Sequence, residues 1–365
     1  MGHIRHKRSF GKIIHPFGKV NNKLLRVNPT VAAARAEPAN TYITLYEYNE
    51  KGVSVTQSTN VPDCKINDSE NKITWINIDG LKKSEIESIG REFYIHPLIV
   101  EDILSQGQRA KVDELGEVYF ALLNMLYFNK QTMSVETEQV SIVLGRNYVL
   151  SFQEDAHRDL FDPIRDKLNV ATSKIRTSGA DYLFYALIDV IVDNYFIILE
   201  QLGGKIESLE EEIIENANTI TLAKISLLRK EMILLKRNTS PVRELVGSIL
   251  RSDSPLIEER TEKYFKDVYD HIIQANELSE NYRDMMLNLH DLYLSEVNLR
   301  MNEVMKVMAI VTCLLAPATV IGGIFGMNFN RMPWLHNQYG FFIAVGAMLL
   351  IPIWMIWLFK KRGWF

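Results

Sequence analysis

The chain contains, at residues 307–325, the stretch VMAIVTCLLAPATVIGGIF, which is nineteen residues without a charge. A second stretch, GFFIAVGAMLLIPIWMIWLF at residues 340–359, adds twenty more. A hydrocarbon core of ~30 Å needs about 20 apolar residues in a helix, so each stretch is long enough to span a membrane. The sequence therefore predicts a transmembrane hairpin over residues 304–365, with spans at 307–325 and 340–359.

The basic residues around the two spans predict their orientation. Lys and Arg are retained on the cytoplasmic side of a membrane. Arg300 and Lys306 precede the first span, and the basic triplet 360–362 follows the second, whereas the connecting loop 327–339 carries only Arg331. We expect both termini in the cytoplasm and the short loop outside.

Composition excludes several classes of protein. A formal net charge of -4 over 365 residues gives no case for nucleic-acid binding. Cys64 and Cys313 are far apart and cannot build a disulfide framework or a cysteine-based zinc site. Neither a nucleotide-binding motif nor a catalytic constellation stands out, so we expect neither a nucleotide partner nor an enzyme. Residues 1–40 are basic and predict a disordered tail, with a lipid-binding arm as the alternative.

Residues 41–178 predict a mixed α/β domain. β-branched and aromatic runs bounded by polar or glycine residues favour strands, and the stretches between them favour helices. The expected strands are 41–48, 73–78, 118–127, 139–144 and 148–152, and the expected helices are 82–93, 97–104 and 159–168.

Residues 179–303 predict a helical region. A helix over 181–216 ends in an acidic cluster, which is either a solvated tip or an attractor of cations. A return arm follows over 223–238, and Pro241 is expected to interrupt it before a short helix that ends at Leu250.

A long stalk helix then leads into the first span. Residues 256–316 are sixty-one positions without Pro or Gly, which allows ~90 Å of continuous helix. Such a rod either transmits movement to the membrane or is a plain stalk.

Two rows of small or polar residues at heptad spacing mark one face of this helix. A 3.5-residue repeat keeps such a face toward a bundle axis. The face is either a packing surface of small residues or the lining of a water-filled pore. One hairpin has too few helices to enclose water, so a pore requires a homo-oligomer. Met305 and Met308 could form an apolar constriction near its cytoplasmic end, and Pro317 is expected to bend the helix. The two rows are Asp291, Asn298, Met305, Thr312, Thr319 and Ser295, Asn302, Ala309, Ala316, Gly323.

Several motifs in order resemble the CorA family of divalent-cation channels, over residues 41 to 365. The tripeptide Gly326-Met327-Asn328 follows the first span, and the remaining motifs lie in the soluble part and the stalk. They are His96-Pro97-Leu98, Glu101-Asp102-Ile103, residues 108–112 (QRAKV), residues 181–183 (DYL), residues 186–189 (ALID), Tyr269-Asp270-His271 and residues 302–307 (NEVMKV).

The resemblance implies a pentameric, funnel-shaped channel in the plasma (inner) membrane, with an α/β cytosolic domain, a long stalk helix and two C-terminal transmembrane helices. It implies passive influx of Mg²⁺, and also of Co²⁺ and Ni²⁺, gated by cytosolic Mg²⁺. Ion selectivity falls on Gly326, Met327 and Asn328. The implied pore positions are Asp291, Asn302, Met305, Met308, Thr319 and Gly323, to which the heptad rows add Thr312 and Ala316. The implied regulatory metal residues are Asp102 and Asp267 between subunits, with Glu101, Asp189 and His271 at a second cytosolic site.

Ion chemistry agrees with this reading of Asn328. Mg²⁺ loses its water reluctantly and prefers oxygen ligands, which an amide and neighbouring backbone carbonyls offer. A helix cap after Gly326 is the alternative role.

The chain departs from the family's pattern in three places. The outer loop at residues 330–334 has no glutamate, Ala110 replaces a common proline, and Gly107 stands where some members have histidine. Two alternative functions stay open. A transporter of zinc, cobalt or nickel is disfavoured by Met327, and a non-transporting membrane-anchored sensor or scaffold is disfavoured by the polar face.

Overall fold

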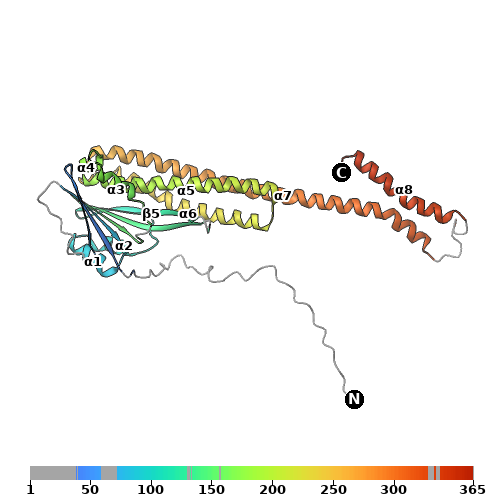
Figure 1. Cartoon of the computed structure of the whole chain (residues 1–365), viewed down its shortest axis with the longest axis horizontal. Coiled ribbons are helices and arrows are strands. Elements are labelled where there is room, and N and C mark those ends of the chain that lie inside the picture. The colour runs from blue at the N-terminus through green and yellow to red at the C-terminus, as the bar shows by residue number, and fades with distance from the viewer. Residues whose placement is uncertain are drawn as a thin grey trace, which may run out of the picture. The chain divides into compact units, whose positions relative to one another are not determined.

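The computed structural model describes residues 38, 40–58, 72–129, 132, 134–155, 158–327, 333 and 338–364 (Figure 1). They form two compact units, each of which is described separately. The described residues within 38–127, 136–196 and 237–274 make up the first, and those within 128–135, 197–236 and 275–364 make up the second. This division follows packing, whereas the predicted borders at 178 and 303 follow changes in secondary structure and hydropathy and stay a prediction.

The elements follow one another from an α/β part into long helices. The strands are β1 (Tyr42–Tyr48), β2 (Val53–Ser58), β3 (Ile73–Asp79), β4 (Lys111–Leu115), β5 (Val118–Asn129), β6 (Ser134–Leu144) and β7 (Tyr148–Gln153). The helices are α1 (Lys83–Glu92), α2 (Pro97–Leu104), α3 (Asp162–Asn169), α4 (Lys174–Thr177), α5 (Ala180–Asn216), α6 (Thr219–Ile249), α7 (Glu259–Phe325) and α8 (Gly340–Lys361).

The strands form one seven-stranded sheet in the order β2-β1-β3-β7-β6-β5-β4. β3 and β7 are parallel, because the chain between them crosses over through α1, α2 and three other strands. One face of the sheet packs against α1 and α2, which Figure 1 shows together beneath it, in a core that includes Ile78, Phe152, Ile89 and Ile103. The expected α/β domain is confirmed.

The opposite face of the sheet is covered by α5 and by the segment at the start of α3. Trp75 of β3 meets Phe161, just before α3, with ring centroids 6.1 Å apart. Tyr119 of β5 meets Phe184 of α5 at the same distance. The start of α5 is therefore a core element of the first unit.

The five expected strands and three expected helices are present, but two strands were missed. β2 and β4 are the edge strands of the sheet. β2 is largely exposed and ends in the polar run Thr56-Gln57-Ser58, and β4 reads KVDEL, so neither sustains the alternation of apolar and polar residues that marks a half-buried strand. Charged and polar edges protect a sheet from pairing with other chains.

The predicted interruption at Pro241 is wrong, because α6 runs through it to Ile249. A proline inside a helix removes one hydrogen bond and crowds the preceding turn. Here Val242, Leu245 and Val246 directly after it are at most 1 % exposed. Their burial holds the helix together across the missing bond.

Among the residues that the structure describes, three helices are long and apolar enough to cross a membrane, and burial distinguishes them. The apolar window of α5 is 61 % buried inside the protein, against 6 % for that of α7 and none for that of α8. The apolar residues of α5 therefore already belong to a protein core. Those of α7 and α8 match the two predicted spans. The 67 residues of α7 extend over ~100 Å and confirm the long stalk helix, which continues through Pro317.

Candidate metal centre and pore-facing helix

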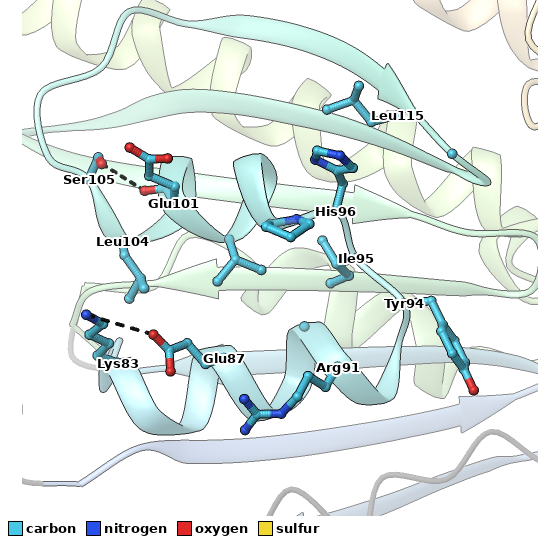
Figure 2. Close-up of a pocket in the computed structure, with 14 residues that line it drawn as sticks. Lys83, Glu87, Arg91, Tyr94, Ile95, His96, Glu101, Leu104, Ser105 and Leu115 are labelled. Carbon is cyan, nitrogen blue, oxygen red and sulfur yellow. Dashed lines mark hydrogen bonds and ion pairs between the residues drawn. The ribbon is translucent and has the colours of Figure 1, made fainter.

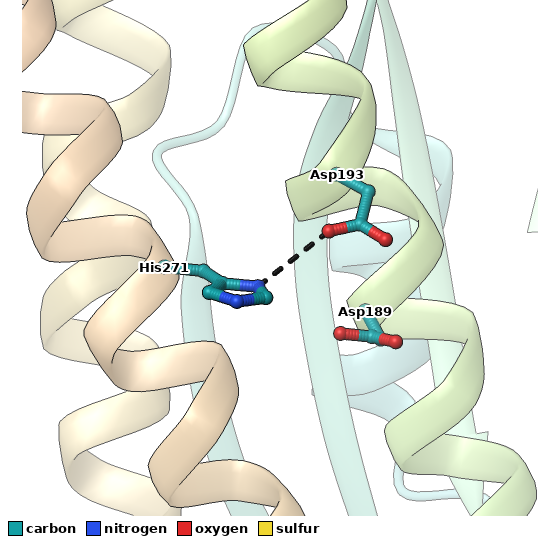
Figure 3. Close-up of side chains that lie close together, drawn as sticks. All are labelled: Asp189, Asp193 and His271. Carbon is teal, nitrogen blue, oxygen red and sulfur yellow. Dashed lines mark ion pairs between the residues drawn. The ribbon is translucent and has the colours of Figure 1, made fainter.

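Three side chains of the first unit form a candidate metal centre (Figure 3). Asp189 and Asp193 lie one turn apart on α5, and His271 faces them from α7. One ligand atom from each lies within 4.8 Å of the others, and His271 Nδ1 is 3.6 Å from Asp193 Oδ1. Asp267, one turn earlier on α7, places its Oδ2 4.0 Å from His271 Nε2. Residues four apart on a helix share a face, so Asp267 lies on the same side of α7 as His271.

Asp189 has an oxygen that is free to bind a cation. Burial raises the pKa of Asp189 above its ordinary value and the charge of Asp193 raises it further, while a hydrogen bond from Tyr185 counteracts both. Tyr185 donates to Oδ2 at 3.1 Å. Oδ1 is buried and has no hydrogen-bond partner within the described residues. A divalent cation beside Oδ1 would compensate the two carboxylates.

The donor set fits a small divalent cation. Carboxylate oxygens suit Mg²⁺, and an imidazole adds affinity for Co²⁺, Ni²⁺ or Zn²⁺. Of the five regulatory residues that the sequence predicted, Asp189, Asp267 and His271 lie together here. Asp193 was missed. Asp193 lies four residues after Asp189, as His271 does after Asp267. This repeated spacing is the sequence signal that identifies Asp193.

Asp102 lies in a different setting, where its charge is already compensated. Lys111 Nζ lies 2.5 Å from its Oδ2, and Gln108 Nε2 donates to its Oδ1 at 2.9 Å. Burial alone would lower the pKa of Lys111, but the hydrogen bonds that it donates to Asp102 and Asp113 raise it above its ordinary value. A metal ion at Asp102 must therefore compete with a tethered ammonium group.

Glu101 precedes Asp102 on α2 but lines a groove between α1 and α2 (Figure 2). This groove has a volume of about 920 Å³. Its floor is apolar, and Arg91, Glu87 and His96 lie around it. Glu101 is thus the one predicted regulatory residue that opens onto this groove, and it is not among the three residues of the metal centre.

In the second unit, one face of α7 is buried and the opposite face is exposed. Met286, Leu289 and Tyr293 are at most 8 % exposed, and Arg300 continues their face. The residues of the predicted rows before the span lie away from this face and are exposed: Asp291, Ser295, Asn298 and Asn302.

Within the predicted span only a narrow strip of α7 is covered, and bulky apolar residues outside the predicted rows, such as Val307, Val311 and Leu315, are exposed as well. Ile310 is only 5 % exposed, and Leu314, Pro317 and Ile321 follow it at helical spacing as partly buried residues. Met348 of α8 lies close to Gly322 on this part of α7. The hydroxyls of Thr312 and Thr319 donate to carbonyls one turn earlier, at 2.8 and 3.0 Å, so neither needs water to be satisfied. The exposed residues of the predicted rows are Met305, Ala309, Thr312, Ala316, Thr319 and Gly323, and the predicted constriction residue Met308 is exposed as well.

The first two residues of the predicted selectivity tripeptide, Gly326 and Met327, follow the end of this helix. Gly326 donates to Gly322 O at 2.9 Å, and Met327 donates to Ile324 O at 3.3 Å, which closes the last turn of α7. Asn328 lies outside the described residues.

Comparison with known proteins identifies the family. The family model described as CorA-like Mg²⁺ transporter protein matches residues 70–361. The chain belongs to the CorA family. The cobalt/magnesium transport protein CorA of Thermotoga maritima is 41% identical over 292 residues, which are 80% of this chain and 83% of that protein. The putative metal ion transporter YfjQ of Bacillus subtilis is 31% identical over 84% of this chain and 94% of its own length.

A solved structure of a CorA protein has the same fold. The complete structure of the CorA magnesium transporter of Methanocaldococcus jannaschii matches with a TM-score of 0.71 at 23% identity, over 88% of this chain and 98% of that one. The soluble α/β part, the long helices and the C-terminal apolar helices of this CorA-family chain thus follow a known arrangement.

Proposed function

We propose that this chain assembles into a homo-oligomeric channel, a pentamer by its family resemblance, through which Mg²⁺ flows passively into the cell. The observation that supports this most is the exposed face of α7, whose polar and small residues have no cover in a single chain of a CorA-family protein. Water cannot be enclosed by one hairpin. Several copies with these faces turned inward form a closed, funnel-like path.

The transported ions follow from the relatives and from the driving force. The Thermotoga relative is named for cobalt and magnesium transport. We extend this to Mg²⁺ and Co²⁺ here, and to Ni²⁺ as a third substrate. The oligomer lies in the lipid of the plasma membrane with both termini in the cytoplasm. An inside-negative potential then favours entry of a divalent ion by ~4.6 kcal/mol per 100 mV.

Selectivity and conduction are assigned to two groups of residues. Gly326, Met327 and Asn328 receive the hydrated ion at the outer mouth, where amide and carbonyl oxygens suit its water shell. The pore is lined by Asp291, Asn302, Met305, Met308, Thr312, Ala316, Thr319 and Gly323, and the two methionines form the apolar constriction.

Gating is assigned to cytosolic Mg²⁺ at two sites. The first is the Asp189, Asp193 and His271 centre with Asp267 beside it. The second lies between copies, where Asp102 of one meets Asp267 of the next. Bound Mg²⁺ favours the closed state only by its greater affinity for that state, so weak binding is sufficient to sense cellular magnesium.

A transition-metal transporter is the second candidate, and one observation favours it. His271 gives the metal centre an imidazole ligand, which suits zinc, cobalt and nickel better than magnesium. Met327 in the tripeptide disfavours it. A non-transporting sensor does not account for the exposed polar face of α7.

Ion flux into liposomes that contain only this protein tests the proposal. We expect uptake of Mg²⁺, Co²⁺ and Ni²⁺ that increases with an inside-negative potential and falls when the lumenal solution, facing the soluble part, contains Mg²⁺. Uptake of Zn²⁺ alone would favour the second candidate. Absence of flux for all four ions in a correctly assembled oligomer would contradict any transport function.

A further inference from the structure

Arg300 joins two helices of the second unit at the end of α5. Its Nη2 donates to Glu215 O at 2.8 Å, and its Nη1 donates to Asn216 Oδ1 at 2.8 Å and to Ala217 O at 3.3 Å. Arg300 comes from α7, and all three acceptors lie at the turn between α5 and α6. One guanidinium group therefore binds three oxygens of another segment.

The chemistry of a helix end makes this contact directional. The last four carbonyls of a helix have no partner within it, and they carry the negative end of the helix dipole. A planar guanidinium presents several donors in a fixed geometry, which an ammonium group does not. Arg300 satisfies carbonyls of α5 that would otherwise bond to water.

The turn that Arg300 binds is itself well ordered by hydrogen bonds. Asn218 Oδ1 accepts from the backbone N–H groups of Ile220 and Thr221, at 2.8 and 3.0 Å, and caps α6. The buried hydroxyl of Thr221 donates to Asn216 O at 3.2 Å. Arg300 thus attaches α7 to a stiff point and not to a loose loop.

The contact also fixes the rotation of α7 about its own axis. Successive residues of a helix are separated by about 100°, so Asn302 lies ~200° around from Arg300 and Ala309 ~180°. Anchoring Arg300 to the α5–α6 turn therefore points Asn302 and Ala309 away from that turn. Met286, Leu289 and Tyr293, which precede Arg300 on α7, are buried on the same face as Arg300 and support this rotation.

We infer that Arg300 is a positioning residue. It sets the rotation of α7 just before the span and so couples the α5–α6 turn to the pore face, which is the face of α7 that carries the two predicted rows. This inference rests on the proposed function, because the exposed face of α7 must meet other copies. Without the contact, the helix rotates more freely, and the pore face no longer points to the axis in every copy.

Cross-linking between copies measures this rotation without relying on flux. Val297 and Asn298 are exposed neighbours at the same height on α7, about 100° apart, and only Asn298 belongs to the pore face. Cys64 and Cys313 are replaced by serine, and single cysteines are introduced as Val297→Cys or Asn298→Cys. A short bis-thiol reagent is then applied to the full chain in membranes. We expect far more cross-linked oligomer from Asn298→Cys than from Val297→Cys.

The Arg300 variants are added to both reporters. Arg300→Gln should reduce the ratio of the two cross-linking yields several-fold, and Arg300→Lys should reduce it less, because it keeps the charge but loses the planar fork. Asn216→Ala removes one acceptor, leaves the charge at 300 in place, and should shift the ratio in the same direction. Arg283→Gln is the matched control, since Arg283 is exposed on the same helix and bonds only to the adjacent Asp284 within the described residues.

The outcomes separate this inference from the proposed function. An unchanged ratio in Arg300→Gln and in Asn216→Ala would overturn the positioning role. So would an equal change in the Arg283→Gln control. If Arg300→Gln does not assemble, Asn216→Ala decides. No cross-links from Asn298→Cys in the otherwise unaltered chain would contradict the pore-forming oligomer itself.

Discussion

The N-terminal and C-terminal parts of α7 differ in how their polar residues are compensated. Near its start, Asp267 and His271 face Asp189 and Asp193 of the same chain, and burial raises the pKa of Asp189. From Asp291 onward, the residues of the pore face are exposed and have no cover within one chain. The candidate ligands of the first part, Asp189, Asp193 and His271, all come from one chain. In the function proposed above, the second part encloses water only where several copies meet.

The largest effect should come from the far end of the C-terminal part. Replacing Asn328 with alanine should abolish Mg²⁺ flux and leave assembly intact, because it removes the amide that meets the hydrated ion. Flux into liposomes and the size of the purified oligomer are the two measurements. Asn330→Ala, in the same loop, serves as the control and should keep its flux. Normal flux in a well-assembled Asn328→Ala oligomer would end the assignment.

The exposed face of α7 should next be distinguished from the partly buried strip that contains Ile310 and Leu314. In a chain without Cys64 and Cys313, a cysteine at Thr312 or Thr319 should react with a small water-soluble thiol reagent at least about tenfold faster than one at Ile310 or Leu314, a difference of ~1.4 kcal/mol. Ile310 is buried, whereas both threonines are exposed. Labelling rates in membranes are the measurement.

Equal labelling at the four positions would mean that the small-residue face packs against protein and does not line water. The proposed pore role of the C-terminal part of α7 would then be wrong, whereas the candidate metal centre near the start of α7 would be unaffected.

The sequence predicted those features that leave a periodic pattern. The uncharged runs marked α7 and α8, and apolar runs marked the central strands. The edge strands β2 and β4 leave no sustained pattern, because β2 is largely exposed and β4 has two acidic residues, Asp113 and Glu114, side by side. The interruption predicted at Pro241 is wrong because the burial of its neighbours outweighs one lost hydrogen bond, and the local sequence does not reveal that burial.

The candidate metal centre was predictable in part. Asp189, Asp267 and His271 came from the resemblance, but Asp193 required knowing that α5 and α7 face each other at this height. The pairing of Asp102 with Lys111 was likewise hidden, since it joins a helix to the following strand. The periodicity of one helix or strand does not show which residues of another element it contacts.

A smaller effect should follow from removing the missed ligand. Asp193→Asn should weaken Co²⁺ binding by about tenfold or more, because even the outer partners of metal ligands contribute that much to affinity. Calorimetric titration of the detergent-solubilised oligomer with Co²⁺ measures this. Asp270→Asn is the matched control, since Asp270 is an exposed carboxylate next to His271 that is not part of the cluster. Equal affinity in both variants would show that the cluster is not a metal centre.

The smallest effect should appear in stability and not in flux, and it concerns a buried carboxyl of the α/β part. Glu138 is 4 % exposed, and its Oε1 accepts from the backbone N–H groups of Glu154 and Asp155 at 2.8 and 2.9 Å. Burial raises its pKa to about 7, although those two bonds act in the opposite direction. Between the ordinary pKa of 4.5 and about 7, the folded chain keeps a proton that the unfolded chain has released. Its stabilising contribution is therefore complete below pH 4.5 and is lost as the pH rises through 7.

The Glu138→Gln variant stays neutral at every pH, so it should raise the apparent melting temperature by a few degrees at pH 8 and leave it unchanged at pH 4. Glu117→Gln, at an exposed turn, should change neither value. A Glu138→Gln protein that melts with the wild-type pH profile would mean that burial does not hold the proton on Glu138.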